Sequence, residues 1–359
     1  WIMAYTTIDD PSAHFQTTLF TGNGSTLAVT NGGNSDLQPD WVWIKNRDRS
    51  GYHHNLYDSS RGVLKQLYSN LENDEHEQAN SLTAFSSDGF TVGSDDSSNY
   101  NTENHVAWQW KANGGTTSSF TESGNNPGGT IQTNTTAGFS IITTTGTGGA
   151  GTIAHGLGAV PHWIVSKCRS HDNTGWGVYH KQNTSEPETE LLGLASTGAT
   201  LDSPSYYNDT APTSSVFTVG TSNDINGDGR TYIFYVFTEK QGYSKFGSYT
   251  GNGDADGTFV YTGFKPAWIM IKRTDSADDW KINDVARDNN EIYGNDASLH
   301  ANENIAETTS ASFNVDFLSN GFKLRSADAG NNADGGTYIY MTFAEHPFVS
   351  SEGVPTTAR

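Results

Sequence analysis

Short runs of bulky apolar residues, separated by polar and glycine-rich stretches, make up most of the chain. A typical run is residues 233–237, which are all β-branched or aromatic, and the runs end at Gly, Asn, Asp or Pro. This pattern is typical of β-strands joined by turns. Pairs such as Asp88-Gly89 and Asn226-Gly227 suit turn positions with positive φ. The sequence therefore predicts a fold built from strands.

One pattern occurs three times along the chain. It reads P-x-W, then alternating bulky residues, then Lys, and it covers residues 39–45, 161–167 and 266–272. Other features keep the same order around each copy. An arginine follows each copy closely, and each copy is later followed by an aromatic strand, at residues 106–110, 232–237 and 338–343. The copies are a whole small domain apart, so we expect three homologous domains.

The expected architecture is all-β, with three tandem homologous antiparallel β-sandwich domains, long loops and at most one or two short helices. The best helical pattern covers residues 61–71, where apolar residues fall on one face. The predicted boundaries are an N-terminal arm at 1–18, repeats at 19–113, 137–240 and 241–348, a Gly/Thr/Asn-rich linker at 114–136 and a C-terminal tail at 349–359.

The repeated tryptophans and lysines are expected to serve the fold. Trp41 and Trp43 are two residues apart and so point to one face, as do Trp108 and Trp110, and we expect them to pack together in the first domain core. The repeated lysines are expected where a core strand emerges into solvent; they are Lys45, Lys167 and Lys272.

The composition of the chain argues against several classes of function. Forty acidic against twenty basic residues give a net charge of −20, which argues against nucleic-acid binding. The apolar runs are far shorter than a membrane-spanning helix, so membrane insertion is not expected. The single cysteine, Cys168, excludes an intrachain disulfide, and we expect it to be a small buried apolar residue.

Two loops resemble the start of a calcium-binding loop. The D-x-N-x-D spacing places three oxygen ligands on one side of a tight turn, and the ligand sets are Asp224, Asn226 and Asp228, and Asn252, Asp254 and Asp256. Position twelve of each loop holds Tyr235 or Gly263 instead of the bidentate Glu. Plain turns are therefore the favoured interpretation and calcium is the alternative; no other cofactor is expected.

The remaining candidates for chemistry are weak. The acidic stretch 72–77, which includes His76, is expected to be a solvated loop, and His54 is expected to pack where the other copies have Trp. Gly146, Gly148 and Gly151 match G-x-G-x-x-G, but no helix pattern follows, so a turn is expected. No catalytic residue is assigned.

Several segments resemble a known group of proteins. Residues 4–17, 37–45, 107–115 and 239–246 are similar to uncharacterised structural proteins of marine tailed phages that infect cyanobacteria and other ocean bacteria. The similarity runs along nearly the whole chain. It implies a virion location and repeated β domains, and it supplies no catalytic residues.

The expected function is that of a non-enzymatic virion structural protein, in a tail fibre, an appendage or a capsid decoration. Its expected partners are other virion proteins and further copies of itself, with a trimer favoured. The N-terminal arm either binds a neighbouring protein or is a disordered leader. The alternative is a carbohydrate-binding module that contacts host surface polysaccharide, and a sandwich-fold glycan hydrolase is the third hypothesis.

Overall fold

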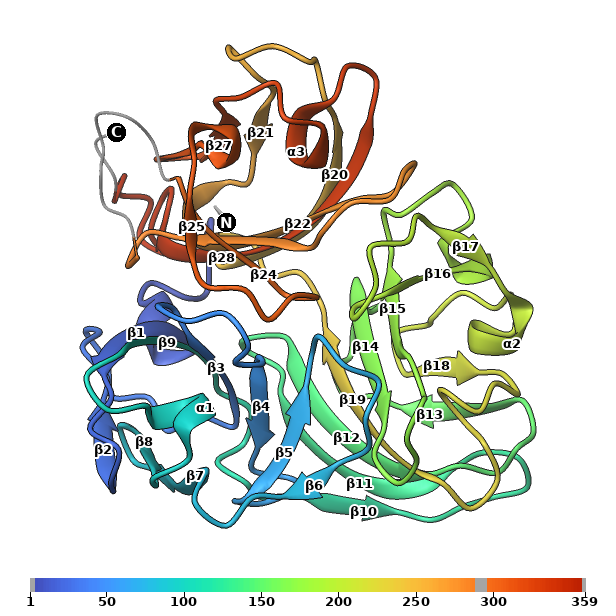
Figure 1. Cartoon of the computed structure of the whole chain (residues 1–359). Helices are drawn as coiled ribbons and strands as arrows, with labels where there is room; N and C mark the ends of the chain where they lie inside the picture. The colour runs from blue at the N-terminus through green and yellow to red at the C-terminus, as the bar shows by residue number, and fades with distance from the viewer. Residues whose placement is uncertain (1–3, 288–295, 357–359) are drawn as a thin grey trace.

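Three large antiparallel sheets contain most of the strands in the computed structural model, which describes residues 4–287 and 296–356. A smaller sheet covers one face of each large sheet, so that each pair forms a β-sandwich module (Figure 1). The three modules follow one another along the chain and lie around a common centre (Figure 1). The predicted all-β class and antiparallel sandwich architecture are confirmed.

In the first module the large sheet has the order β1-β9-β3-β4-β5-β6 and the small sheet has the order β2-β8-β7. The bounds of these strands are β1 Phe15–Thr21, β2 Leu27–Thr30, β3 Trp41–Asn46, β4 Asn55–Asp58, β5 Lys65–Tyr68, β6 His76–Glu77, β7 Leu82–Ser86, β8 Gly89–Val92 and β9 Asn104–Trp110.

The second module has the same plan, with two additional strands in its large sheet and one fewer strand in its small sheet. Its large sheet has the order β10-β11-β12-β19-β14-β15-β16-β17, and β13 pairs with β18. The bounds are β10 Ser118–Phe120, β11 Gly128–Asn134, β12 Phe139–Thr145, β13 Gly151–Ala154, β14 Trp163–Cys168, β15 Trp176–His180, β16 Glu190–Gly193, β17 Leu201–Asp202, β18 Val216–Val219 and β19 Thr231–Phe237.

The third module has the sheet orders β20-β28-β22-β23-β24-β25 and β21-β27-β26, which match the first module strand for strand. The bounds are β20 Ser244–Thr250, β21 Phe259–Tyr261, β22 Phe264–Arg273, β23 Lys281–Asp284, β24 Ala297–His300, β25 Thr308–Thr309, β26 Val315–Leu318, β27 Gly321–Leu324 and β28 Thr337–Pro347.

Helix is confined to single turns in the described residues. There are three α-helical turns, one more than expected, and three 3₁₀ turns; they are α1 Asp96–Asn99, α2 Pro204–Tyr207, α3 Ala329–Asn332, and Pro11–Ala13, Pro187–Thr189 and Ala311–Phe313. The helix predicted at 61–71 is wrong. Leu64 has a φ of 67°, which a right-handed helix cannot contain, and residues 65–68 form β5 at the side of β4.

The central strands have two buried faces that serve different purposes. Val42 and Ile44 of β3 face the small sheet and lie in the sandwich core, together with Phe90. Trp41 and Trp43 point to the opposite face, which belongs to a cluster shared by all three modules. The tryptophans of the first module do pack together, but they do so in this shared cluster and not inside their own sandwich, which corrects the expectation.

The shared cluster, which we call the hub, holds the three modules together. The ring of Trp41 stacks on Tyr235 of the second module with 4.2 Å between centroids, and Trp110 meets Trp268 of the third module edge to face at 5.7 Å. Each large sheet thus buries one face against its own small sheet and the other against its neighbours. Such a hub removes far more apolar surface from water than three separate sandwiches would.

The segments predicted as arm and linker also belong to the folded body. Of the arm, residues 15–18 form part of β1, and Ile8 lies buried in the hub. Thr6 Oγ1 donates to the backbone oxygen of Gln241 at 2.9 Å, so this segment packs on the start of the third module. The predicted linker 114–136 contains β10 and β11, which extend the second sheet. Residues 1–3 of the arm and 357–359 of the tail lie outside the described residues.

Candidate functional site

Three equivalent positions face the hub at the junctions between modules. In each large sheet the tryptophan of the P-x-W motif lies opposite the last residue of the next strand. These last residues are Asp58, His180 and Asp284. Two of the three are buried acids, so the junctions are the first place where buried chemistry has to be examined.

At the junction of the first and second modules, Asp58 is bound by one residue from each module. Arg61 Nε donates to its Oδ2, and the hydroxyl of Tyr235 donates to the same oxygen at 2.8 Å. Both side chains of the Asp58–Arg61 ion pair are fully buried. A buried carboxylate is stable only with such charge-assisted hydrogen bonds.

Glu75 extends this cluster across the junction. Arg61 Nη1 donates to Glu75 Oε2 at 3.0 Å, and Arg169 of the second module binds both carboxylate oxygens at 2.9 Å. Burial raises the pKa of Glu75, but the hydrogen bonds from Arg169 and the charge of Arg61 outweigh it, and the net pKa is lowered. Glu75 therefore stays ionised and joins two modules.

The junction of the third and first modules repeats this arrangement. Arg287 Nε donates to Asp284 Oδ2 at 2.6 Å, and Trp108 Nε1 donates to the same oxygen at 2.9 Å. Glu307 accepts from Arg287 at 3.0 Å and from Arg47 of the first module at 2.7 and 2.9 Å. The repeated arginine after each P-x-W strand thus reaches across to the preceding module at two of the three junctions.

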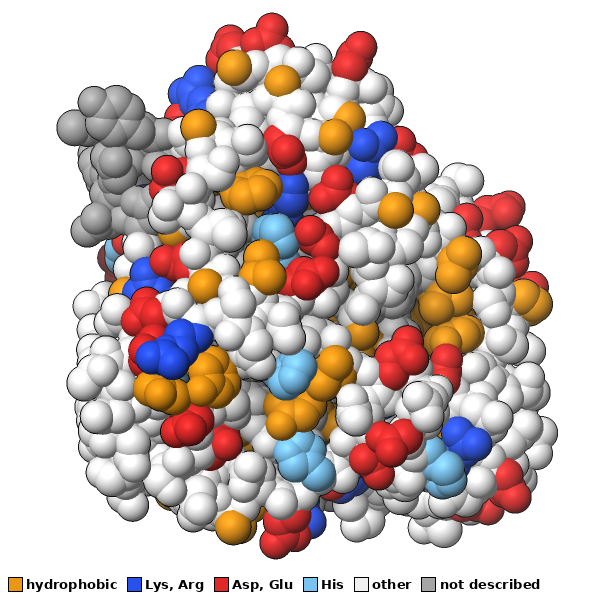
Figure 2. Space-filling model, in the orientation of Figure 1, with side chains coloured by type: hydrophobic (Ala, Val, Ile, Leu, Met, Phe, Trp, Pro, Cys, Tyr) orange, Lys and Arg blue, Asp and Glu red, His pale blue; other side chains and the backbone are white. Residues whose placement is uncertain are grey.

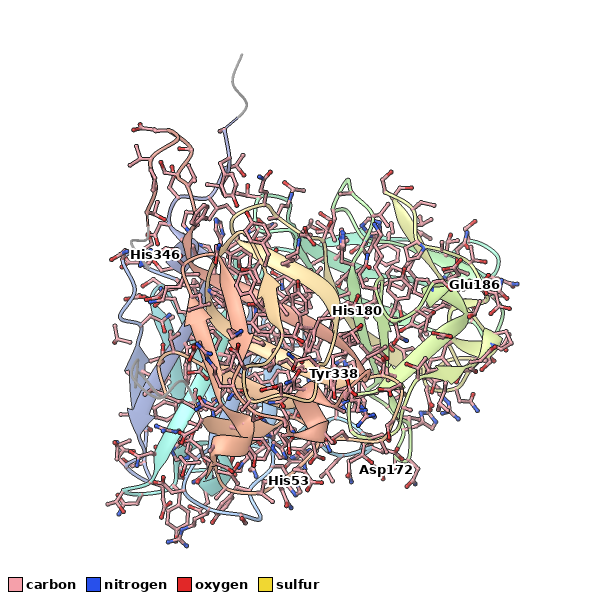
Figure 3. The ribbon with its side chains drawn as sticks, turned by 90° about the horizontal axis from the view of Figure 1, so that it is seen from above. His53, Asp172, His180, Glu186, Tyr338 and His346 are labelled. Atoms are coloured by element: carbon pink, nitrogen blue, oxygen red, sulfur yellow. The ribbon has the colours of Figure 1, made fainter. Side chains whose placement is uncertain are left out.

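The junction of the second and third modules is built without these charges. His180 occupies the position of the acid and donates from Nε2 to the backbone oxygen of Tyr340 at 3.2 Å. Burial lowers the pKa of His180 to about 3, so the ring is neutral at ordinary pH. Met341 stands where Trp108 and Tyr235 stand in the other sheets, and it has no hydrogen to donate. Figure 3 shows His180 between the strands of these two modules.

A second set of hydrogen bonds joins modules at two of the three junctions. Trp176 Nε1 donates to the backbone oxygen of Tyr68 in the first module at 2.9 Å, and Trp280 Nε1 donates to that of Gly193 in the second module at 2.9 Å. His54 holds the equivalent position and accepts from Trp43 Nε1 at 2.8 Å. The expectation that His54 packs in place of a tryptophan is confirmed, since it is fully buried.

The three repeated lysines are buried, which corrects the expectation that they emerge into solvent. Each ammonium group donates to the backbone oxygen of the next residue, and two of them also bind a carbonyl of the preceding module. Lys167 reaches the oxygen of Glu72 at 3.3 Å, and Lys272 reaches that of Thr197 at 3.1 Å. Burial lowers the pKa of Lys45 to about 7 and that of the other two lysines to about 8.

The first predicted calcium loop contains a residue with a structural role. Asn226 is fully buried; its Nδ2 donates to the oxygens of Gly149 and Gly220, and its Oδ1 accepts from the backbone of Thr147. Asn99 and Asn332 make the same set of bonds in the other modules. We call these three residues the asparagine clamp.

The clamp also explains the glycine pattern beside it. A Cβ on Gly146 would lie 2.3 Å from the oxygen of Gly227, and Gly22 and Gly251 are restricted in the same way. Sequence reasoning missed the clamp. The signal available was an Asn five residues before each closing aromatic strand, at Asn99, Asn226 and Asn332.

Most of the other predicted calcium ligands are bound by protein groups. Asp224 accepts from the hydroxyl of Tyr206, Asn252 from the clamp residue Asn332 at 2.9 Å, and Asp254 from the backbone of Asp256. Asp256 pairs with Lys323 and Arg325. For Asp228, the structure shows its Cβ packed beside Gly148. Across residues 4–287 and 296–356, no three or more His, Cys, Asp or Glu are grouped to hold a metal ion.

The other residues singled out in the sequence differ in how far they are buried. Glu72 and Glu77 are exposed as expected of a solvated loop, but Glu75 in the same stretch is mostly buried at the junction. His76 Nε2 lies 3.2 Å from the hydroxyl of Tyr68 at the surface. Cys168 is fully buried, as expected.

Two hollows of similar construction lie at the surface of the junctions. The one between the second and third modules has a volume of about 570 Å³ and is lined by His162, Glu239, Lys245, Phe259, Tyr261 and Tyr340, among others. The one between the third and first modules has a volume of about 430 Å³ and is lined mostly by small and aliphatic residues. The first is the candidate binding site, because it combines aromatic rings with polar groups.

The described helices are too short and too polar for any of them to cross a membrane. Comparisons with curated proteins and with solved structures returned no match. A family model described as a domain of unknown function, DUF7483, matches residues 10–347, which spans all three modules and the hub between them. This chain is therefore a member of the DUF7483 family.

Proposed function

We propose that the protein is a non-enzymatic structural component of a phage particle, in a tail fibre, an appendage or a capsid decoration. The observation that carries the proposal is the closed ring of three sandwiches around one apolar hub. The buried acids are bound by arginines that join modules, as Glu75 and Glu307 show, so their chemistry serves assembly of the body.

This architecture suits a component that is exposed to the environment. Each large sheet is covered on both faces, and local opening of one module would break the hub and the ion pairs of its neighbours. The acidic surface, with red side chains spread over the three lobes in Figure 2, favours solubility over attachment to nucleic acid. The resemblance to marine phage structural proteins supports the virion as the location.

The proposed partners are other virion proteins and further copies of the chain. The inner faces of the modules are already used within one chain, which takes the form of a trimer of modules. Contacts with partners would therefore use the outer surfaces. The expected trimer of chains stays a prediction, and light scattering of the purified protein measures it directly.

The experiment that tests the structural role uses intact phage particles whose genome encodes this chain. Particles purified by density gradient are analysed by mass spectrometry and labelled with an antibody against the chain for electron microscopy. We expect stoichiometric amounts of the chain and label on the tail or the capsid. A chain that is abundant in infected cells but missing from purified particles would overturn the proposal.

Carbohydrate binding is the second candidate function. The observation that favours it is the pair of exposed aromatic side chains Phe259 and Tyr261, which are 44% and 51% exposed beside the larger hollow. Large exposed aromatic groups next to a concave surface are typical of ligand-binding sites. Binding of fluorescently labelled protein to host cells, and its loss after enzymatic removal of surface polysaccharide, tests this function.

A further inference from the structure

We propose that the hollow between the second and third modules binds a neutral oligosaccharide. This inference rests on the carbohydrate-binding function and names its site and the class of sugar. The hollow is formed by strand β20 and strand β21 of the third module and by residues of the second, including Glu239 and Gln182. Its volume of about 570 Å³ lies within the usual range of small-molecule sites, which is about 300–1,000 Å³.

The repeats show that the fold does not require aromatic residues at the rim. Pairing with the neighbouring strand makes Phe259 equivalent to Ala28 and Thr152, and Tyr261 equivalent to Thr30 and Ala154. The residue between them is a buried β-branched residue in every module. The buried middle position is therefore similar in all three modules, whereas the two exposed positions on either side of it are aromatic only in the third module.

A tyrosine from a central strand of the third module also lines this hollow. Tyr340 is only 2% exposed and lines the hollow. Gly247 makes room for it, because a Cβ there would lie 2.4 Å from the Tyr340 oxygen. A phenol hydroxyl both donates and accepts hydrogen bonds, so a ligand hydroxyl in the hollow can bind to it.

The equivalent hollow at the junction of the third and first modules lacks this group. The register of the central strands places Ala107 where Tyr340 stands, and the rim residue Thr30 replaces Tyr261. Two hollows of one construction therefore differ in the residues that suit a ligand. The difference points to a function at one of them and offers the other as an internal control.

The charges in the hollow favour a neutral ligand. Glu239 and Lys245 lie 3.5 Å apart, and each is about one-third exposed, so they compensate each other and leave no net charge to select an ion. Donors and acceptors are both present, including the exposed amide of Gln182. Sugar rings combine apolar C–H faces, which pack on aromatic rings, with hydroxyls that both donate and accept hydrogen bonds.

The test uses the full chain and a printed array of neutral and charged oligosaccharides, followed by calorimetric titration with the strongest neutral ligand. We expect at least one neutral oligosaccharide to bind. Replacing both Phe259 and Tyr261 with Ala should weaken binding at least about tenfold, because two exposed aromatic contacts are lost. Tyr340→Phe should weaken it about fivefold, as expected for one hydrogen bond, without lowering the melting temperature.

The control variants are Leu19→Ala and Thr30→Ala, which alter the equivalent hollow of the first module. They should leave the affinity unchanged. Binding of charged sugars only would overturn this site, and so would binding that is unchanged by both the double Ala variant and Tyr340→Phe. In either case the protein would still bind carbohydrate, but at another place on its surface. If no sugar binds the unaltered protein, both the site and the carbohydrate-binding function fail. The presence of the chain in particles is measured separately.

Discussion

Trp108 and Asp284 lie 176 residues apart in the sequence, and the indole nitrogen of Trp108 donates a hydrogen bond to the carboxylate of Asp284 at 2.9 Å. Tyr235 and Asp58 form the equivalent bond at the next junction. At the third junction both members have changed, since Met341 and His180 occupy these positions. Each junction thus has both the hydrogen-bond donor and the buried acid, or it has neither. The reason is that a buried carboxylate without its donor would be strongly destabilising.

The first prediction concerns this bond. Tyr235→Phe removes only the hydroxyl that binds Asp58, and we expect the free energy of unfolding to fall by about 1.5–3 kcal/mol, the range for a hydrogen bond to a charged group. Urea denaturation followed by tryptophan fluorescence measures the change. Met341→Leu at the equivalent position is the control, and it should cost less than about 1.5 kcal/mol. Equal losses in the two variants would contradict the role of the bond.

The second prediction concerns the ion pairs across the junction. Glu75→Gln removes the carboxylate that both Arg61 and Arg169 bind and leaves Asp58 as the acid paired with Arg61, and stability should fall by about 3 kcal/mol. Glu77→Gln, two residues away, is the control. Glu77 is 62% exposed and pairs with Lys65, so its loss should cost less than about 1 kcal/mol.

The pH dependence of stability should also differ in Glu75→Gln. The folded-state pKa of Glu75 is lowered below its ordinary value of 4.5, so its contribution is present above that pH and is lost as the pH falls through the folded-state pKa. In Glu75→Gln this part of the acid destabilisation should be missing. Denaturation midpoints between about pH 5 and pH 3 measure it, and identical slopes in both proteins would contradict the prediction.

The third prediction concerns the buried histidines. Burial lowers the pKa of His180 to about 3 and that of His105 to about 4, whereas both titrate near 6.5 when unfolded. As the pH falls below 6.5 the unfolded state takes up protons first, so stability falls by up to about 1.4 kcal/mol per pH unit for each such histidine. His180→Asn should be less stable at pH 7 but should show a shallower slope between pH 6.5 and about 4.

The fourth prediction concerns the alkaline side. The pKa of Lys45 is lowered by burial from 10.5 to about 7, despite the opposing charge of Glu307. Between these values the unfolded state binds the additional proton, so stability rises with pH by up to about 1.4 kcal/mol per unit. Lys45→Met should remove this part of the slope. A slope between pH 7 and 10 that is the same in both proteins would contradict the burial of the charge.

The fifth prediction separates the asparagine clamp from a calcium site. Asn226→Asp keeps an oxygen but removes the donor to Gly149 and Gly220, and stability should fall by at least about 2 kcal/mol. Differential scanning fluorimetry in calcium chloride and in a chelator measures the ion's effect. We expect equal melting temperatures of the unaltered protein in the two buffers, and a rise of several degrees with calcium would restore the loop hypothesis.

Several features of the fold could be derived from local patterns. Runs of apolar residues between turn residues predicted the strands, and the recurrence of P-x-W predicted three equivalent units. The helix expected at 61–71 shows the limit, because apolar spacing matched a helix while Leu64 adopts a positive φ. Backbone conformation at one residue decides such a case, and periodicity carries no information about it.

The candidate site depended still more on tertiary structure. Phe259 and Tyr261 alternate with Val260 as in any half-buried strand, and Tyr340 belongs to an apolar strand. Only the packing of the third module against the second brings them to one hollow with Glu239. The asparagine clamp is visible in the sequence as an Asn at the same distance before each closing strand. Asn is so common in the chain that this spacing alone does not distinguish these three residues from the others.

The sequence by itself determined that the chain forms strands, that it contains three related units and that the repeated tryptophans are buried. Tertiary structure decided which face each tryptophan occupies. All six positions of β3 are buried, so both faces of the strand are equally apolar in the sequence. Alternation distinguishes two faces but not which partner covers each, and that depends on contacts between residues as distant as Trp41 and Tyr235.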